Sequence, residues 1–277
     1  MPTATAYQSR GRAKALGVPL VIKGNAKLMP PVIEISAVQK KYGNVVALAN
    51  ASFSVATSEV VAIVGPSGCG KSTLLNIIAG FDEPTGGTVL VHGSPILAPG
   101  PERSVVFQQP ALFPWLNVRR NITFGFSRSK AAKESARVDE FIDIMGLRGF
   151  EGSYPYQLSG GMMQRVSIAR ALIRDPEVLL MDEPFGALDA QTRLTMQELL
   201  HDVWARYAPT IVFITHDVDE AVFISDRVLV MSARPGCIRD VVEVPLKRPR
   251  SYELIMSAAF VEIKRRVLAE LHTPVRS

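Results

Sequence analysis

The chain has 277 residues, 47% of them hydrophobic, and a mean hydropathy of +0.16. That length can bury a large core in one domain or in two lobes, and no apolar run reaches the ~18 residues of a membrane span, which argues against an integral membrane protein. The two cysteines, Cys69 and Cys237, show neither metal-ligand spacing nor a disulfide framework, and they fit a reducing compartment.

The formal net charge of +5 is confined to one segment. Residues 1–31 hold five basic residues and no acidic one, so the rest of the chain carries 26 of each sign. A neutral body argues against nucleic acid as a partner. We expect residues 1–31 to be a basic, flexible, solvated extension, with contact to anionic lipid or a partner as the alternative. We expect residues 32–277 to form the folded domain.

The first elements are predicted strands. Val32–Val38 alternates apolar and polar residues, residues 45–55 are rich in β-prone types, and a turn is expected between them at Lys40–Gly43. Tyr42 stands just before the strands that lead to a glycine-rich loop. Its ring either stacks on a nucleotide base or is an ordinary surface aromatic, and the local sequence leaves both interpretations open.

The glycine-rich loop follows an apolar strand over residues 60–64 and opens a segment with helical spacing. This is the context that the phosphate-binding pattern G-x-x-x-x-G-K-[ST] requires. Glycines let main-chain N–H groups approach an anion, and the helix N-terminus adds partial positive charge. In this pattern the lysine reaches the β- and γ-phosphates and the hydroxyl binds Mg²⁺, which assigns those roles to Lys71 and Ser72. The predicted nucleotide-binding loop comprises Gly65, Pro66, Ser67, Gly68, Cys69, Gly70, Lys71, Ser72 and Thr73.

Two more strands are predicted after the first helix. They cover Thr88–His92 and Arg103–Phe107, and a turn at Phe81–Gly87 precedes them. Gln108 follows the second strand, at the end where parallel sheets place ligands. Gln108 therefore either contacts Mg²⁺ or a water near the γ-phosphate, or it is simply solvated.

Residues 109–172 are predicted to form a mostly helical lobe inserted into the α/β core. Asn117 can cap a helix over Val118–Phe124, and apolar spacing predicts another helix over residues 131–145. The apolar turn Phe113–Leu116 is either buried in this lobe or exposed as an interaction patch.

A second candidate anion site starts a helix predicted over residues 160–174. Ser159 can cap this helix, and Gly160 and Gly161 expose main-chain N–H groups at its start. One chain cannot easily bring this helix end to a phosphate that the first loop already wraps. A site shared between two copies of the chain resolves the difficulty.

The order of these motifs resembles that of the ATP-binding cassette (ABC) ATPases. Leu158–Gly161, followed by Gln164-Arg165, resembles the family signature, which closes over ATP held by the glycine loop of a second subunit. Residues 178–183 resemble the Walker B strand, and Gly186–Asp189 resembles the D-loop. The resemblance covers about residues 32–270. It implies an α/β fold: a P-loop NTPase (RecA-like) core with an N-terminal antiparallel β subdomain and an inserted helical subdomain.

The resemblance also implies roles for single residues. Asp182 would bind Mg²⁺, Glu183 would polarise the attacking water as general base, and His216 would hold the water and Glu183 in place. Met163 departs from the Gln or Arg that many importers carry beside the signature. The implied site is catalytic through Lys71, Glu183 and His216, binds Mg²⁺ through Ser72, Gln108 and Asp182, and binds ATP through Tyr42, the glycine loop, Gln108, Ser159, Gly160, Gly161 and Asp189.

Four segments resemble the nitrate, sulfonate and taurine group of bacterial importers: Phe107–Val118, Met231–Gly236, Glu243–Leu246 and Arg248–Arg250. This implies an ATP-hydrolysing importer subunit at the cytoplasmic face of the inner membrane, peripheral to it. Its partners would be a second ATPase subunit, transmembrane permease subunits and, indirectly, a periplasmic solute-binding protein. The alternatives are a soluble ABC-type ATPase acting on nucleic acid or ribosomes, supported by the basic tail alone, and an exporter ATPase.

The C-terminal part of the chain is predicted to contain few elements. We expect strands over residues 228–231 and 238–244 and an amphipathic helix over residues 252–271. No appended regulatory module is expected after this helix.

Overall fold

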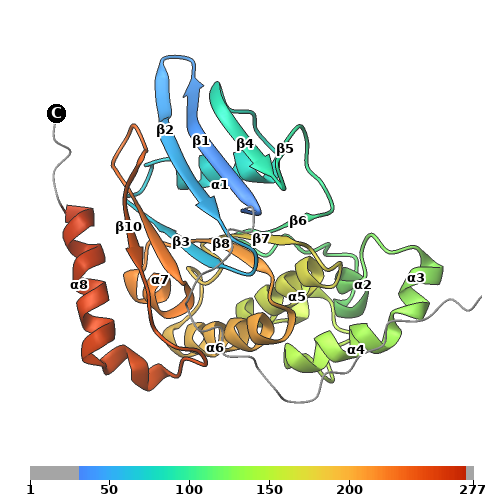
Figure 1. The fold of residues 1–277 in the computed structure, drawn as a ribbon. Helices are drawn as coiled ribbons and strands as arrows, with labels where there is room; N and C mark the ends of the chain where they lie inside the picture. Colours follow the sequence, from blue (N-terminus) through green and yellow to red (C-terminus); the bar gives the residue numbers. More distant parts are fainter. Residues whose placement is uncertain (1–30, 273–277) are drawn as a thin grey trace, which may run out of the picture.

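The structure is a computed structural model and describes residues 31–272 (Figure 1). The basic extension predicted over residues 1–31 lies outside this range except for its last residue. The described chain forms two β-sheets with helix α1 (Lys71–Ala79) between them, and most of the other helices cover the far side of the second sheet (Figure 1).

Strand β3 (Val60–Val64) lies inside the second sheet and is buried on both faces. Val61 and Ile63 pack with α1 and the first sheet, whereas Ala62 and its neighbours at positions 60 and 64 pack with the helices on the opposite face. A central parallel strand needs such a continuous apolar run because neither face meets water. This burial on both faces agrees with the α/β core that the sequence predicts.

The second sheet has the strand order β10-β9-β3-β8-β7-β6, and only β10 is antiparallel to its neighbour. Parallel strands end at the same edge, so residues that follow β3, β7 and β8 meet there, where such sheets bind ligands. The other strands of this sheet are β6 (Arg103–Val106), β7 (Val178–Asp182), β8 (Thr210–Ile214), β9 (Arg227–Met231) and β10 (Ile238–Glu243).

The first sheet is antiparallel, with the order β2-β1-β4-β5. The turn predicted at Lys40–Gly43 is wrong at its start, because β1 continues through Tyr42, which pairs with Val45. Gly43 and Asn44 make the reversal, and Gly43 has the left-handed φ of +56° that a glycine tolerates. The strands are β1 (Ile33–Tyr42), β2 (Val45–Val55), β4 (Gly86–Val91) and β5 (Ser94–Pro95).

A helical region lies between β6 and β7, as predicted. The Asn117 side chain accepts a hydrogen bond from the Arg120 N–H and caps the first helix of this region. This helix ends before the predicted Phe124, because the Thr123 hydroxyl donates back to a helix carbonyl and Gly125 has a left-handed φ. The single helix predicted over residues 131–145 is wrong, since Glu134 interrupts it. The helices are α2 (Val118–Ile122), α3 (Arg128–Lys133), α4 (Ser135–Ile144), a 3₁₀ turn (Pro155–Gln157) and α5 (Gly160–Leu172).

The C-terminal part adds three helices and a 3₁₀ segment. The helix predicted over residues 252–271 is broken at Ser257, whose extended backbone ends the 3₁₀ segment and whose hydroxyl accepts from the Phe260 N–H. No helix within residues 31–272 is long and apolar enough to cross a bilayer. These elements are α6 (Ala190–Tyr207), α7 (Val218–Ile224), the 3₁₀ segment (Tyr252–Met256) and α8 (Ala258–His272).

Arg248 and Arg250, which follow β10, donate hydrogen bonds to main-chain carbonyls at the end of α7. Arg250 is buried and donates to three carbonyls at this helix end, including those of Phe223 and Ser225, so its positive charge meets the negative end of the helix. Arg248 lies 4.2 Å over the Trp204 ring and donates to Nδ1 of buried His201, whose Nε2 donates to the Phe223 carbonyl. His201 is therefore held neutral, and burial beside these arginines lowers its pKa to about 4.

Candidate functional site

The glycine loop joins β3 to α1, and its last glycine has no room for a side chain. Gly70 begins α1 with a φ of +105°, and a side chain there would meet the Ala47 carbonyl at 2.9 Å. Gly68 has a φ of +74°. Lys71 is buried, and its ammonium donates to the Gly65 and Pro66 carbonyls at 2.8 and 3.1 Å, so it folds back over the loop.

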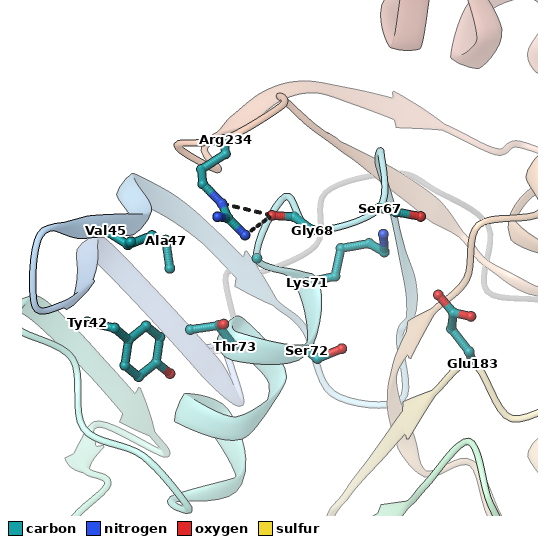
Figure 2. A pocket seen from close by; sticks show the side chains of 11 residues that line it. Tyr42, Val45, Ala47, Ser67, Gly68, Lys71, Ser72, Thr73, Glu183 and Arg234 are labelled. Carbon is teal, nitrogen blue, oxygen red and sulfur yellow. Dashed lines mark hydrogen bonds between the residues drawn. The ribbon is translucent and has the colours of Figure 1, made fainter.

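Not every side chain of the predicted loop faces the pocket beside it. The main chain of Cys69 belongs to the loop, but its thiol is buried in the core, and burial raises its pKa. A pocket of about 300 Å³ lies over the loop, and residues of the first sheet and of the end of β7 form part of its walls (Figure 2). Its walls are formed by Tyr42, Val45, Ala47, Ser67, Gly68, Gly70, Lys71, Ser72, Thr73, Glu183 and Arg234.

The structure places Tyr42 in the wall of this pocket, although it could not be assigned there from its neighbours alone. Its hydroxyl bonds to the Asp82 carboxylate, and this hydrogen bond raises the pKa of Tyr42. The Lys40 ammonium lies 4.9 Å from the ring centroid and also bonds to Asp82. The ring is thus held in one orientation in the pocket wall, where the residue remains about half exposed.

Asp182 ends β7 beside the start of α1. Burial raises the pKa of its carboxyl, and a hydrogen bond from Ser72 offsets part of this rise. Within residues 31–272 no group of three or more His, Cys, Asp or Glu side chains could hold a metal by itself. Two converging oxygens, with phosphates and water to complete the shell, fit Mg²⁺, which usually takes few protein ligands.

Side chains that follow neighbouring strands of the second sheet meet at the carboxylate of Glu183. Its Oε2 lies 3.0 Å from Nδ1 of His216 and 3.4 Å from Nε2 of Gln108, so three strand ends meet at one carboxylate. Its φ of +43° is unusual for a residue with a side chain, and its N–H donates to the Ile214 carbonyl. Such strain persists where the surroundings fix the backbone, and it concentrates at functional sites.

The signature and D-loop residues lie together, but they are not part of the same pocket. Ser159 caps α5 by accepting from the Met162 N–H, and Asp189 caps α6 by accepting from the Thr192 N–H. Gly161 fits closely against Thr192, whose methyl lies 2.6 Å from where a Cβ would stand. Neither these residues nor Gly160 are among those that line the pocket over the loop. The predicted site is therefore divided into two parts within one chain.

Two arginines of the site were missed by the sequence reasoning. Arg234 lines the pocket from the turn between β9 and β10, in a segment interpreted only as a mark of the importer subgroup. Arg193 of α6 donates to the carbonyl of Leu188 in the D-loop and pairs with Asp217 and Glu220, which follow His216 in the chain. The signal for Arg193 was its position four residues after Asp189, one turn into α6.

The apolar turn Phe113–Leu116 is held in shape but remains at the surface. The Asn121 amide, buried, donates to the carbonyls of Phe113 and Leu116 and accepts from the Phe113 N–H. Trp115 is 69% exposed and lies against Phe113, which packs on Phe124 at a centroid distance of 4.0 Å. Of the two predicted alternatives, the structure favours an exposed aromatic patch.

Comparison with known proteins agrees with this geometry. A family model described as ABC transporter matches residues 48–186. An uncharacterized ABC transporter ATP-binding protein of Methanocaldococcus jannaschii is 51% identical over 225 residues, covering 80% of this chain and 83% of that protein. An aliphatic sulfonates import ATP-binding protein, SsuB of Bacillus cereus, is 48% identical over 232 residues, covering 83% of this chain and 90% of that protein.

Solved structures give the same result. The cassette MJ0796, titled a bacterial ABC transporter cassette, was solved as a dimer and, in a second structure, in a post-hydrolysis state bound to ADP and Pi. Its two structures match this chain with TM-scores of 0.67 and 0.65 at 31% and 30% identity, and each match covers 78% of this chain and 100% of the other. The chain therefore belongs to the ABC transporter family, as an ATP-binding and ATP-hydrolysing cassette.

Proposed function

We propose that this cassette energises a bacterial importer of aliphatic sulfonates, or of a similar small solute such as nitrate or taurine. The observation that carries the proposal is its 48% identity, over 90% of that protein's length, to an ATP-binding protein of aliphatic sulfonate import. The resemblance of Phe107–Val118 to the same subgroup adds support, because this segment includes Phe113 and Trp115 of the exposed aromatic patch.

The geometry at the end of β7 supports a division of roles in hydrolysis. Glu183 would accept the proton of the attacking water, and His216 would orient both water and carboxylate from its position 3.0 Å away. Lys71 would exchange its two loop carbonyls for phosphate oxygens and offset their charge. Ser72 and Asp182 would hold Mg²⁺, which when bound would neutralise charge on the phosphates.

A second copy of the chain would complete the site. Ser159, Gly160 and Gly161 begin α5 with main-chain N–H groups suited to an anion, yet they do not line the pocket of their own chain. Two copies arranged head to tail would set the signature of each against the loop of the other, with Asp189 at the contact. The solved structure of the MJ0796 cassette is dimeric, which supports a dimer of this chain.

The aromatic patch would receive the transmembrane permease subunits. Trp115, Phe113 and Phe124 offer adjacent apolar rings on the helical region, which we place at residues 109–172 of a cassette spanning residues 32–277. Aromatic side chains of this kind often dominate binding at protein interfaces. The cassette would then lie at the cytoplasmic face of the inner membrane, and a periplasmic solute-binding protein would act on it through the permease.

The test is purification of the cassette with its membrane partners from detergent extracts, followed by ATPase assays in proteoliposomes. We expect permease subunits to co-purify, and a sulfonate presented with the solute-binding protein to stimulate hydrolysis several-fold. The Glu183→Gln variant serves as the matched control for contaminating ATPases. Stimulation by nucleic acid or ribosomes, with no membrane partner recovered, would contradict the proposal.

A further inference from the structure

The turn between β9 and β10 is built directly onto the nucleotide-binding loop. Gly236 bonds to β2 in both directions, through its N–H to the Ala47 carbonyl at 3.0 Å and through its carbonyl to the Ala49 N–H at 2.8 Å. A side chain at Gly236 would come within 2.0 Å of the Cys69 carbonyl in the loop. The turn therefore cannot shift without displacing either the loop or the first sheet.

The turn is also fixed internally, so that it presents one side chain. The Ser232 hydroxyl donates to the Pro235 carbonyl at 3.0 Å and accepts from the Cys237 N–H at 3.1 Å, while the Ser232 N–H donates to the Cys237 carbonyl. Arg234 stands at the tip of this closed turn. Its side chain reaches over the loop toward the pocket (Figure 2).

The guanidinium of Arg234 is anchored on the loop. Its Nη2 and Nε lie 3.2 and 3.3 Å from the Gly68 carbonyl oxygen, and no carboxylate within the described residues pairs with it (Figure 2). Lys71 is the other cationic residue in the pocket wall, and it lies on the side of Ser72 and Glu183. Arg234 lies instead between the loop and the wall formed by Val45 and Ala47.

We propose that Arg234 is a nucleotide-binding residue that contacts the α-phosphate, between the base and the distal phosphates. Tyr42 marks the end of the pocket for the base, and Lys71 with Ser72 marks the end for the β- and γ-phosphates, so Arg234 meets the part of the ligand between them. A planar guanidinium suits a phosphate because it donates two parallel hydrogen bonds. The inference does not depend on which solute is transported.

This position predicts an effect on affinity rather than on turnover. Arg234 is not among the groups that contact Glu183, which are His216 and Gln108. ATP and ADP both carry an α-phosphate, so both should lose affinity by the same factor when Arg234 is replaced. A lost charge-assisted hydrogen bond corresponds to about a tenfold change in Kd.

The experiment measures Kd for Mg-ATP and Mg-ADP by titration calorimetry of the full chain, with ATP titrated in the Glu183→Gln background. We expect Arg234→Met to weaken the binding of both nucleotides about tenfold and Arg234→Lys to recover part of this loss. Arg265→Met, an exposed arginine of α8 paired with Glu262, is the matched control and should leave both Kd values unchanged.

A second measurement separates phosphate contact from support of the loop. A direct ionic contact is screened by salt, so the Kd of the wild type should rise more steeply with ionic strength than that of Arg234→Met. Equal salt dependence, or a lysine variant as weak as the methionine variant, would show that Arg234 only holds Gly68 and would overturn the proposal. So would a loss confined to ATP, or affinities within twofold of the wild type.

Discussion

Replacement of Glu183 by glutamine tests whether the carboxylate at the end of β7 is the general base. The two side chains have the same shape, and the amide oxygen of glutamine can still accept a hydrogen bond from either His216 or Gln108, now 3.0 and 3.4 Å away. Strain at the φ of +43° and the bond to the Ile214 carbonyl belong to the backbone and are unchanged. The substitution therefore removes basicity and little else.

The expected fall in kcat can be estimated because the substitution removes only the group that accepts the proton. General base catalysis contributes about 10²–10⁴-fold, so kcat should fall at least a hundredfold, which corresponds to roughly 3 kcal/mol of barrier. The Kd for Mg-ATP should stay within about threefold, because Glu183 is not needed to bind phosphate. If two copies enclose ATP, the variant should also accumulate as an ATP-bound dimer, since hydrolysis no longer opens it.

Single-turnover hydrolysis with radiolabelled ATP and size-exclusion chromatography with light scattering give the two readouts. Glu177→Gln is the matched control: this exposed carboxylate precedes the opposite end of β7, and its variant should hydrolyse ATP like the wild type. Hydrolysis by Glu183→Gln at more than a tenth of the wild-type rate would refute Glu183 as the base. Loss of ATP binding would refute the separation of binding from chemistry.

Three further predictions concern other parts of the structure. Replacement of Phe113 and Trp115 by alanine should leave basal hydrolysis intact and weaken co-purification with permease subunits; undiminished co-purification would move the docking surface elsewhere. Arg193→Ala should break the link between the D-loop and Asp217, the neighbour of His216, and lower kcat about tenfold at unchanged ATP affinity; wild-type turnover would show that the link is not used. His201 has a pKa of about 4 in the folded protein and 6.5 when unfolded, so between pH 6.5 and pH 4 it takes up a proton only on unfolding. Its contribution to stability is therefore fully present above pH 6.5 and is lost as the pH falls toward 4, by up to about 3 kcal/mol. Chemical denaturation at pH 7 and pH 5 should therefore show a smaller loss of stability in His201→Gln than in the wild type, and equal losses would contradict the assignment.

Short-range features of this protein were determined by the sequence itself. The glycine loop, the caps at Asn117 and Ser159, and the buried strand over residues 60–64 each depend on neighbouring residues, because φ values, capping bonds and burial on both faces are local demands. The family motifs placed Glu183 and His216 at strand ends, and the parallel sheet then brought those ends together.

The errors in the predicted elements have specific causes. The breaks at Glu134 and Ser257 interrupt segments whose apolar spacing is helical on both sides, so periodicity alone predicts one helix in each case. The start of the first turn was misplaced because Lys40 and Tyr42 are anchored on Asp82, about forty residues further on, and this keeps them in the strand.

Only the tertiary structure decided which residues share the pocket. Arg234 reaches the loop because β9 lies next to β3 and Gly236 bonds to β2, contacts across more than 160 residues of chain that no local pattern encodes. The same holds for the thiol of Cys69, which the packing turns into the core although its main chain belongs to the loop. Local conformation follows from backbone sterics and capping, whereas the composition of a site depends on strand order and packing, which bring distant segments together.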